Sequence, residues 1–119
     1  MLKVLAVDDE PEICKVIDKF LTKKGFLVLV AYTGEDALAI FEKEKIDLVI
    51  LDKKMPGIGG LGVLNELKRR KLNVPVIILT GSLGTREEEA REMGSLDILH
   101  KPIDLSTLLE KVNHRLGKP

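Results

Sequence analysis

The chain of 119 residues has no Trp, one Tyr, three Phe and a single Cys. So few aromatic rings disfavour stacking on nucleic acid bases, and Leu, Ile and Val must fill the core instead. Cys14 has no second cysteine to pair with, which excludes an intramolecular disulfide. One Cys and two His scattered along the chain match no zinc-binding spacing, so a structural zinc ion is disfavoured.

The chain also lacks net charge and long apolar runs. Nineteen basic and nineteen acidic residues give a formal net charge of zero, so no overall field attracts nucleic acid or an anionic membrane. No apolar stretch approaches the roughly 18 residues of a membrane-spanning helix, and the apolar run at the N-terminus is too short for a signal peptide. We therefore expect a cytoplasmic protein that binds neither nucleic acid nor membranes directly.

The length fits one domain, since single domains cluster at roughly 100–150 residues. With 45% hydrophobic residues the chain can bury a core. We expect residues 1–119 to form a single domain without a separate output module. Whether this domain stands alone or belongs to a longer regulator stays open.

Five short apolar runs have the length of β-strands. They are Val4–Val7, Leu27–Val30, Leu48–Leu51, Val76–Leu79 and the weaker Leu96–Leu99. The first four are continuous rather than alternating, as strands covered on both faces require, and they predict a parallel sheet between helical layers. The fifth run is interrupted by Asp97 and is expected at an edge of the sheet.

Helical patterns separate these runs. Two segments carry apolar residues at i, i+3, i+4 and i+7, the spacing of one helix face. They are Ile13, Val16, Ile17 and Phe20, and Leu105, Leu108, Leu109 and Val112. We expect both of these faces to lie in the core. Pro11 suits the first turn of a helix, and Gly25 suits a helix stop. Thr33 and Thr85 each precede an acidic residue by three, a capping pattern, the latter for a helix expected over residues 85–93. Strand and helix thus alternate five times, which predicts a doubly wound α/β fold.

Reactive side chains follow the predicted strands at their carboxyl ends. Asp8 and Asp9 follow the first run, and Asp52 follows the third. Thr80 comes after the fourth run and Lys101 after the fifth. Because the carboxyl ends of parallel strands share one edge of the sheet, we expect these side chains to form one site.

Three carboxylates in one cleft repel each other and favour protonation or a bound cation. Few carboxylates with open coordination positions suit Mg²⁺, which keeps several waters and bridges protein oxygens to a phosphoryl group. Lys101 adds a positive charge for an oxyanion, and Thr80 adds a hydroxyl donor. The loop after the first run has no glycine, which argues against a Rossmann or P-loop phosphate cradle.

Four short motifs complete this pattern. They are Val7–Pro11 (VDDEP), Leu51–Gly57 (LDKKMPG), Leu79–Gly81 (LTG) and Lys101–Pro102. In this order and spacing, the chain resembles a response-regulator receiver domain of two-component signalling over nearly its whole length. The resemblance implies a flavodoxin-like (βα)5 fold, a doubly wound parallel five-stranded sheet in the order 2-1-3-4-5.

The resemblance also implies that Asp52 accepts a phosphoryl group from the phosphohistidine of a sensor histidine kinase or phosphotransfer protein. Asp9, Asp52 and the main-chain carbonyl of Lys54 would hold Mg²⁺, and Asp8 would act through water. Lys101 would pair with the phosphoryl group. The protein would thus be a signalling switch that assists its own phosphorylation and dephosphorylation, and not an enzyme.

By the same resemblance, Thr80 would turn inward to bond the phosphoryl group and switch the surface of the fourth helix, fifth strand and fifth helix. That surface would contact a downstream effector protein or domain, or a second copy of the chain on phosphorylation. Ile98 replaces the usual Tyr or Phe of the family, so we expect Thr80 to carry most of the coupling. Gly59 replaces a frequent acidic residue before Gly60, and we expect a more mobile start of the third helix.

Two of these features also have a purely structural interpretation. Asp8 and Asp9 would stabilise the positive end of a helix by roughly 0.3–1 kcal/mol. The run Lys68–Lys71 is expected to complement the C-terminal dipole of the third helix and not to bind nucleic acid, because neither net charge nor aromatic residues accompany it.

A second functional class stays open, a Mg²⁺-dependent phosphohydrolase with an aspartyl nucleophile. Such hydrolases usually carry a second acid two residues after the nucleophile, and a cap domain. Lys54 occupies that offset from Asp52, and 119 residues leave no room for a cap. A receiver used only for docking is disfavoured because the acids, Thr80 and Lys101 are all present.

Overall fold

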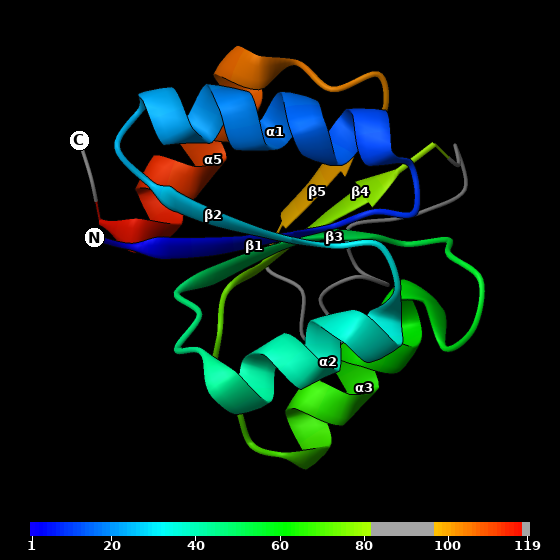
Figure 1. The fold of residues 1–119 in the computed structure, drawn as a ribbon. Coiled ribbons are helices and arrows are strands. Elements are labelled where there is room, and N and C mark those ends of the chain that lie inside the picture. The colour runs from blue at the N-terminus through cyan, green and yellow to red at the C-terminus, as the bar shows by residue number, and fades with distance from the viewer. Residues whose placement is uncertain (82–96, 118–119) are drawn as a thin grey trace.

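The structure, a computed structural model, describes residues 1–81 and 97–117. Its centre is a five-stranded sheet in the order β2-β1-β3-β4-β5, with every neighbouring pair parallel (Figure 1). The strands are β1 (Lys3–Val7), β2 (Leu27–Ala31), β3 (Leu48–Asp52), β4 (Val76–Thr80) and β5 (Asp97–His100). The predicted doubly wound arrangement and strand order are confirmed.

Helices cover both faces of the sheet. They are α1 (Pro11–Lys23), α2 (Gly34–Lys43), α3 (Gly59–Arg69) and α5 (Leu105–Leu116). Helices α1 and α5 lie on one face, and α2 and α3 lie on the other (Figure 1). The helix expected over residues 85–93, with its capping pattern at Thr85, lies outside the described residues. None of the described helices is both long and apolar enough to cross a membrane.

Alternate residues of the central strands fill two separate cores. On β3, Leu48 and Ile50 belong to the core under α1 and α5, whereas Val49 and Leu51 belong to the core under α2 and α3. All four side chains are fully buried, which explains why this strand is aliphatic without interruption. Burying one such side chain stabilises the fold by about 1.5–3 kcal/mol. Strands β1 and β4 are buried in the same way.

The outer strands differ from this pattern. Leu27 on the edge strand β2 is 41% exposed and residues 28–30 are half-buried. Val28 packs against the core under α1 and α5, and Leu29 packs against the core under α2 and α3, so both faces of this run are covered as predicted, but less completely than those of the central strands. An aliphatic run alone does not reveal that its strand has a neighbour on one side only. Strand β5 is the other edge, as Asp97 indicated. Asp97 pairs there with Lys111 and Arg115 of α5.

Helix α1 buries a face that is rotated from the predicted one. Cys14, Ile17 and Leu21 are buried, whereas Val16 is 49% exposed. At about 100° per residue, Val16 lies roughly 120° around the helix from the centre of that buried face. Placing Val16 in the core was therefore wrong, because the predicted stripe left out Cys14 and Leu21.

Several helix ends lie where the sequence predicted them from capping, proline and glycine residues. Pro11 is the first residue of α1, and Gly25, just after its end, has φ +94°. The Thr33 hydroxyl accepts a hydrogen bond from Asp36 N at 3.0 Å, as the capping pattern predicted. Asp104 is a cap that the sequence pattern did not reveal, and it accepts hydrogen bonds from two amides in the first turn of α5.

The start of α3 depends on a close approach of main chain to main chain. A Cβ at Gly60 would lie 2.2 Å from the Asp52 carbonyl oxygen. Gly60 N also donates to the Lys53 carbonyl oxygen at 3.2 Å, so α3 begins in direct contact with the end of β3. Gly59 adopts φ +67°, a conformation that glycine accepts most readily. Gly60 therefore has a packing role, and Gly59 a conformational one, that the sequence did not indicate.

We expect Gly60→Ala to lower the free energy of unfolding by about 1–3 kcal/mol, because the new methyl group overlaps a main-chain oxygen. Urea denaturation followed by circular dichroism measures the change. Gly81→Ala is the control, since a Cβ at Gly81 meets no atom of the described residues within 4 Å. Equal stability of Gly60→Ala and the parent protein would contradict the close approach.

Candidate functional site

The carboxyl edge of the sheet gathers the side chains that the sequence placed at strand ends. Asp8 and Asp9 follow β1, and Asp52 is the last residue of β3. Thr80 ends β4, and Lys101 follows β5. Lys101 N donates to the Thr80 carbonyl oxygen at 2.8 Å, which extends the β4–β5 pairing to this edge. Parallel pairing thus brings together residues that are up to 93 positions apart, from Asp8 to Lys101 (101 − 8).

Three carboxylates form a compact cluster at this edge. One oxygen from each of Asp8, Asp9 and Asp52 lies within 4.8 Å of the others. Asp8 is fully buried and Asp52 is 5% exposed, whereas Asp9 is open to solvent. The cluster therefore has a buried side at Asp8 and a solvent side at Asp9.

The Lys101 ammonium contacts two of these carboxylates. Its Nζ lies 2.9 Å from Asp8 Oδ2 and 3.4 Å from Asp52 Oδ1. A further acid, Glu10, places Oε1 3.8 Å from the same nitrogen. The Lys101 side chain is 17% exposed, so solvent screens these pairs less than it screens pairs on the open surface. One ammonium thus offsets part of the charge of the cluster.

Main-chain groups and a thiol fix the position of Asp8. Asp8 N donates to the Ala31 carbonyl oxygen of β2 at 3.1 Å. Asp8 Oδ1 accepts a hydrogen bond from Glu10 N at 2.9 Å. The Cys14 thiol donates to the Asp8 carbonyl oxygen at 3.3 Å. Burial, with the nearby Asp8 charge, raises the pKa of Cys14 to about 11, so the thiol stays protonated as a donor. A lone cysteine in the sequence gave no sign of this role.

The electrostatics of the cluster alter the ionisation of Asp52. Burial, together with the charge of Asp8, raises the pKa of Asp52 to about 6 although Lys101 lowers it. Burial by itself lowers the pKa of Lys101, but Asp8, Asp52 and Glu10 raise it above its usual value. At neutral pH Asp52 is therefore mostly ionised and lies beside a charged lysine.

The donor set fits a small, hard cation such as Mg²⁺. Asp8 Oδ2 is buried and faces Lys101 Nζ, yet it accepts no hydrogen bond of regular geometry from any of the described residues. A buried carboxylate oxygen beside two further carboxylates is the ligand type that Mg²⁺ prefers. The exposed Asp9 leaves room for the waters that Mg²⁺ retains. Lys54, whose carbonyl the resemblance implies as a further ligand, lies two residues after Asp52 in the β3–α3 loop.

Thr80 and Ile98, to which the sequence assigned unequal parts in switching, have different surroundings. Thr80 is 1% exposed at the end of β4. Ile98 on β5 is half-buried and packs against the core under α2 and α3. Ile98 therefore already buries part of its surface in this structure.

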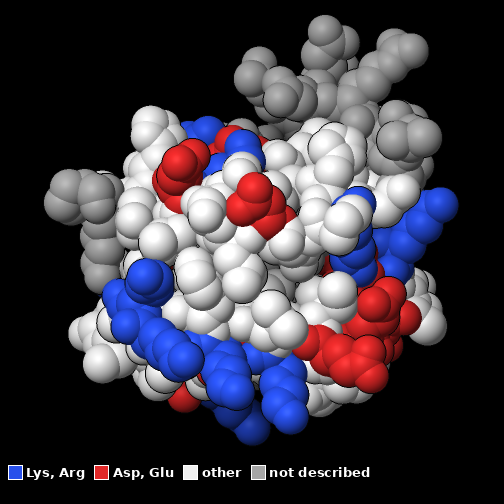
Figure 2. Space-filling view, turned by 90° about the horizontal axis from the view of Figure 1, so that it is seen from above, with Lys and Arg blue, Asp and Glu red and all other residues white. Residues whose placement is uncertain are grey.

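Basic side chains are concentrated on one part of the surface although the chain is neutral. Figure 2 looks onto the α1 and α5 face and shows a row of basic side chains along one rim, whereas elsewhere on this face acidic and basic side chains lie beside each other. Exposed lysines on α1 are spaced by four residues, at Lys15, Lys19 and Lys23. At the end of α3, by contrast, Arg69 and Arg70 both pair with Glu66. This is the solvated helix end that we expected for the run Lys68–Lys71.

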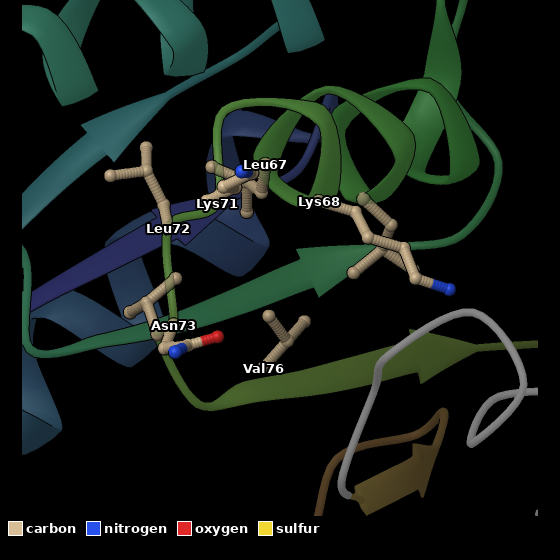
Figure 3. Close-up of a pocket in the computed structure, with 8 residues that line it drawn as sticks. Leu67, Lys68, Lys71, Leu72, Asn73 and Val76 are labelled. Carbon is tan, nitrogen blue, oxygen red and sulfur yellow. The ribbon is translucent and has the colours of Figure 1, made fainter.

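A pocket of about 480 Å³ lies at the other end of β4 (Figure 3). Its lining includes Leu67, Leu72, Asn73 and Val76. Val76 is the first residue of β4 and Thr80 the last, so the pocket and the carboxylate cluster lie at opposite edges of the sheet. None of the acids of the cluster lines it.

Comparison with known proteins identifies the family. Residues 4–113 match the response regulator receiver domain family. Sporulation initiation phosphotransferase F of Bacillus subtilis is 36% identical over 116 residues, which cover 96% of this chain and 93% of that protein. The chain belongs to the response regulator receiver domain family.

Other relatives are longer proteins. Transcriptional regulatory protein ZraR of Salmonella typhimurium is 34% identical over 117 residues, which cover 98% of this chain and 26% of ZraR. The probable transcriptional regulator ycf27 of Porphyra purpurea is 40% identical over 118 residues, which cover 98% of this chain and 48% of ycf27. The chain thus spans about a quarter to a half of the length of these two regulators.

Solved structures share the fold over nearly the whole chain. Response regulator TrrA from Thermotoga maritima, in complex with Mg²⁺ and BeF, has a TM-score of 0.87 and 35% identity, covering 97% of this chain and 99% of TrrA. Chemotaxis protein CheY4 of Vibrio cholerae has a TM-score of 0.86 and 32% identity, covering 96% of this chain and 98% of CheY4. The expected single receiver fold is thereby confirmed.

We expect the stability of the metal-free protein to contain a contribution that falls as the pH rises from about 4 to about 6. The pKa of Asp52 rises from 3.8 to about 6 on folding, so the folded state binds this proton more tightly than the unfolded state does. The bound proton stabilises the fold fully below the unfolded pKa, and that stabilisation is lost as the pH passes through the folded pKa. Urea denaturation at closely spaced pH values in a chelating buffer measures the slope.

Asp52→Asn is the matched control for this pH dependence. Its amide does not titrate, so the difference between the two stability curves isolates Asp52 from the other acids of the chain. The curves should converge toward pH 4 and separate toward pH 6, with the variant the more stable at the higher pH. Two parallel curves would contradict a raised pKa of Asp52.

Proposed function

We propose that this domain accepts a phosphoryl group on Asp52 in a Mg²⁺-dependent reaction and transmits the event through its surface. The supporting observation is the cluster of Asp8, Asp9 and Asp52 with Lys101 in contact with its two buried members. The donor is the phosphohistidine of a sensor histidine kinase or of a phosphotransfer protein. The target of the signal is a downstream effector protein or domain.

Asp52 is the nucleophile in this proposal. One of its carboxylate oxygens forms the new O–P bond while the P–N bond to the donor imidazole breaks, and the electron pair of that bond goes to the nitrogen. Asp9, Asp52 and the Lys54 carbonyl hold Mg²⁺, with Asp8 acting through water. When bound, the cation supplies positive charge that offsets the carboxylates and the phosphoryl oxygens.

Lys101 and Thr80 stabilise the phosphorylated state in this proposal. Lys101 Nζ already lies 3.4 Å from Asp52 Oδ1, so it is within reach of a phosphoryl oxygen attached there. The Thr80 hydroxyl turns inward and donates to a second phosphoryl oxygen. Lys101 N donates a main-chain hydrogen bond to the Thr80 carbonyl oxygen. Because of this link, Lys101 and Thr80 respond together to the phosphoryl group and alter the surface around β5 and α5. Phosphorylation-dependent dimerisation through that surface belongs to the same proposal.

Receiver domains are signalling switches and not conventional enzymes, and this chain is assigned the same role. We infer a cytoplasmic location without direct binding to nucleic acid or membranes. This inference is supported by the formal net charge of zero and the lack of a long apolar run. Residues 1–119 are taken together as the receiver domain.

We expect acetyl phosphate with Mg²⁺ to add one phosphoryl group to the protein, and Asp52→Asn to take none, because the amide is a poor nucleophile. Excess chelator should also prevent the reaction, since the carboxylates then repel the anionic donor. Intact mass spectrometry measures both results. Asp36→Asn, on the exposed first turn of α2, is the control and should react like the parent.

Two outcomes would contradict the proposed phosphoacceptor. One is a mass increase that survives Asp52→Asn, and the other is equal labelling with and without chelator. Sustained release of phosphate from small phosphate esters, abolished by Asp52→Asn, would instead support the Mg²⁺-dependent phosphohydrolase.

Asp9→Ala should weaken Mg²⁺ binding at least about tenfold, yet leave the metal-free protein as stable as the parent or more so. The substitution removes one of three repelling carboxylates and a ligand open to solvent. Titration of amide chemical shifts with MgCl₂ gives the affinity, and urea denaturation gives the stability.

Glu12→Ala is the control for Asp9→Ala, because Glu12 is an exposed acid in the first turn of α1. It should leave Mg²⁺ affinity nearly unchanged. Strong destabilisation of metal-free Asp9→Ala would favour the interpretation of Asp9 as a helix-stabilising charge, and would contradict its role as a ligand.

A further inference from the structure

Helix α2 contacts the β3–α3 loop through Glu35. Residues 53–58 form this loop, since β3 ends at Asp52 and α3 begins at Gly59. Ile58 N donates a hydrogen bond to Glu35 Oε1 at 3.3 Å. Both carboxylate oxygens of Glu35 also lie 2.9 Å from the position that a Cβ on Gly57 would occupy. The Glu35 carboxylate is therefore in direct contact with the end of the loop.

Helix α2 and the β3–α3 loop pack closely around the hydrogen bond from Ile58 N to Glu35. A Cβ on Gly34 of α2 would lie 2.6 Å from Ile58 Cγ1, and a Cβ on Gly62 of α3 would lie 2.7 Å from Ile58 Cβ. Ile58 therefore packs directly against the main chain of both helices, although it is 43% exposed. Gly57 has φ +79°, which suits a residue without a side chain. The contact between α2 and the loop is thus built from several neighbouring positions.

Other bonds anchor the loop near the carboxylate cluster. Lys53 N donates to the Leu79 carbonyl oxygen of β4 at 2.9 Å, which fixes the start of the loop. The Lys53 carbonyl oxygen accepts a hydrogen bond from Gly60 N at 3.2 Å, which ties the start to the first turn of α3. Lys54 is exposed and lies between Lys53 and the contact with Glu35. The position of Lys54 therefore depends on anchors before it and after it in the chain.

We propose that Glu35 is a positioning residue for the cation site, because it holds the β3–α3 loop in the conformation in which the Lys54 carbonyl meets Mg²⁺. The assignment of Lys54 rests on the proposed function, whereas the contact with the loop exists in the metal-free protein. Holding the loop before the cation arrives reduces the conformational freedom that binding must remove. Glu35 thus raises Mg²⁺ affinity without touching the ion.

Glu35→Ala should weaken Mg²⁺ affinity about two- to tenfold, as expected for the loss of one hydrogen bond. In the metal-free protein it should also speed hydrogen exchange of the Ile58 amide, because that amide loses its acceptor. Titration of amide chemical shifts with MgCl₂ and exchange in a chelating buffer, both on the full chain, measure these effects. Glu35→Gln keeps an acceptor oxygen without the charge and should restore most of the affinity and the protection.

Asp36→Ala is the matched control, since it removes the same charge one residue further along the first turn of α2. Its affinity and exchange should stay close to those of the parent. Equal weakening of Mg²⁺ binding in Asp36→Ala or in Glu35→Gln would show that charge alone acts, and would overturn the proposal. So would unchanged affinity or unchanged Ile58 exchange in Glu35→Ala. A parent protein that binds no Mg²⁺ would instead overturn the proposed function, which is a distinguishable failure.

Discussion

Repulsion among carboxylates at one edge of the sheet is the constraint that the rest of this structure must satisfy. Burial and the charge of Asp8 raise the pKa of Asp52 to about 6, so the attraction of Lys101 does not fully compensate for them. An arrangement of this kind opposes folding at neutral pH. It persists because two aliphatic cores and parallel pairing on both sides of β3 hold the strand ends together. The site is thus maintained by interactions that lie elsewhere in the molecule.

The same repulsion explains how the site can respond to a ligand. Anything that binds the folded state alone stabilises it, and a cation among these acids gains from charges that are already in place. Asp8 N donates to the Ala31 carbonyl oxygen, and the Asp8 carboxylate accepts a hydrogen bond from Glu10 N, so the carboxylate is held in place without a cation. The unfavourable free energy of repulsion among these acids is therefore relieved when a cation binds. Asp9, open to solvent, is the member through which the cluster can exchange ions with the surroundings.

The sequence revealed those parts of the fold and site that follow from periodicity along the chain. We could place Asp8, Asp52 and Lys101 at one edge of the sheet because the carboxyl ends of parallel strands share an edge, whatever the details of packing. Periodicity also located α1 and α5, but it put Val16 in the core because the orientation of α1 depends on the sheet beneath it. It gave no means of telling Asp8, which is fully buried, from its neighbour Asp9, which is exposed.

Close approaches between distant segments were the least predictable features. Gly60 packs against the Asp52 carbonyl oxygen, and Cys14 donates to the Asp8 carbonyl oxygen. Each contact depends on where the main chain of another element passes, and no local pattern in the sequence records that path. The site side chains could be listed from the sequence, whereas the groups that hold them in place could be found only in three dimensions.

Two different connections lead away from Asp52, and they differ in what they can transmit. On one side, Lys101 reaches the cluster by a side-chain ion pair and is tied to Thr80 by a main-chain bond, so a new charge on Asp52 can redirect the lysine without breaking the sheet. On the other side, the β3–α3 loop is held by main-chain bonds from Lys53 to Leu79 and from Gly60 to Lys53. Bonds of that kind resist displacement, because a broken main-chain bond leaves polar groups without partners. The Lys101 side chain is therefore suited to move if Asp52 is phosphorylated as proposed, while the main chain of β4 and β5 stays paired, and the loop is suited to hold the proposed cation in place.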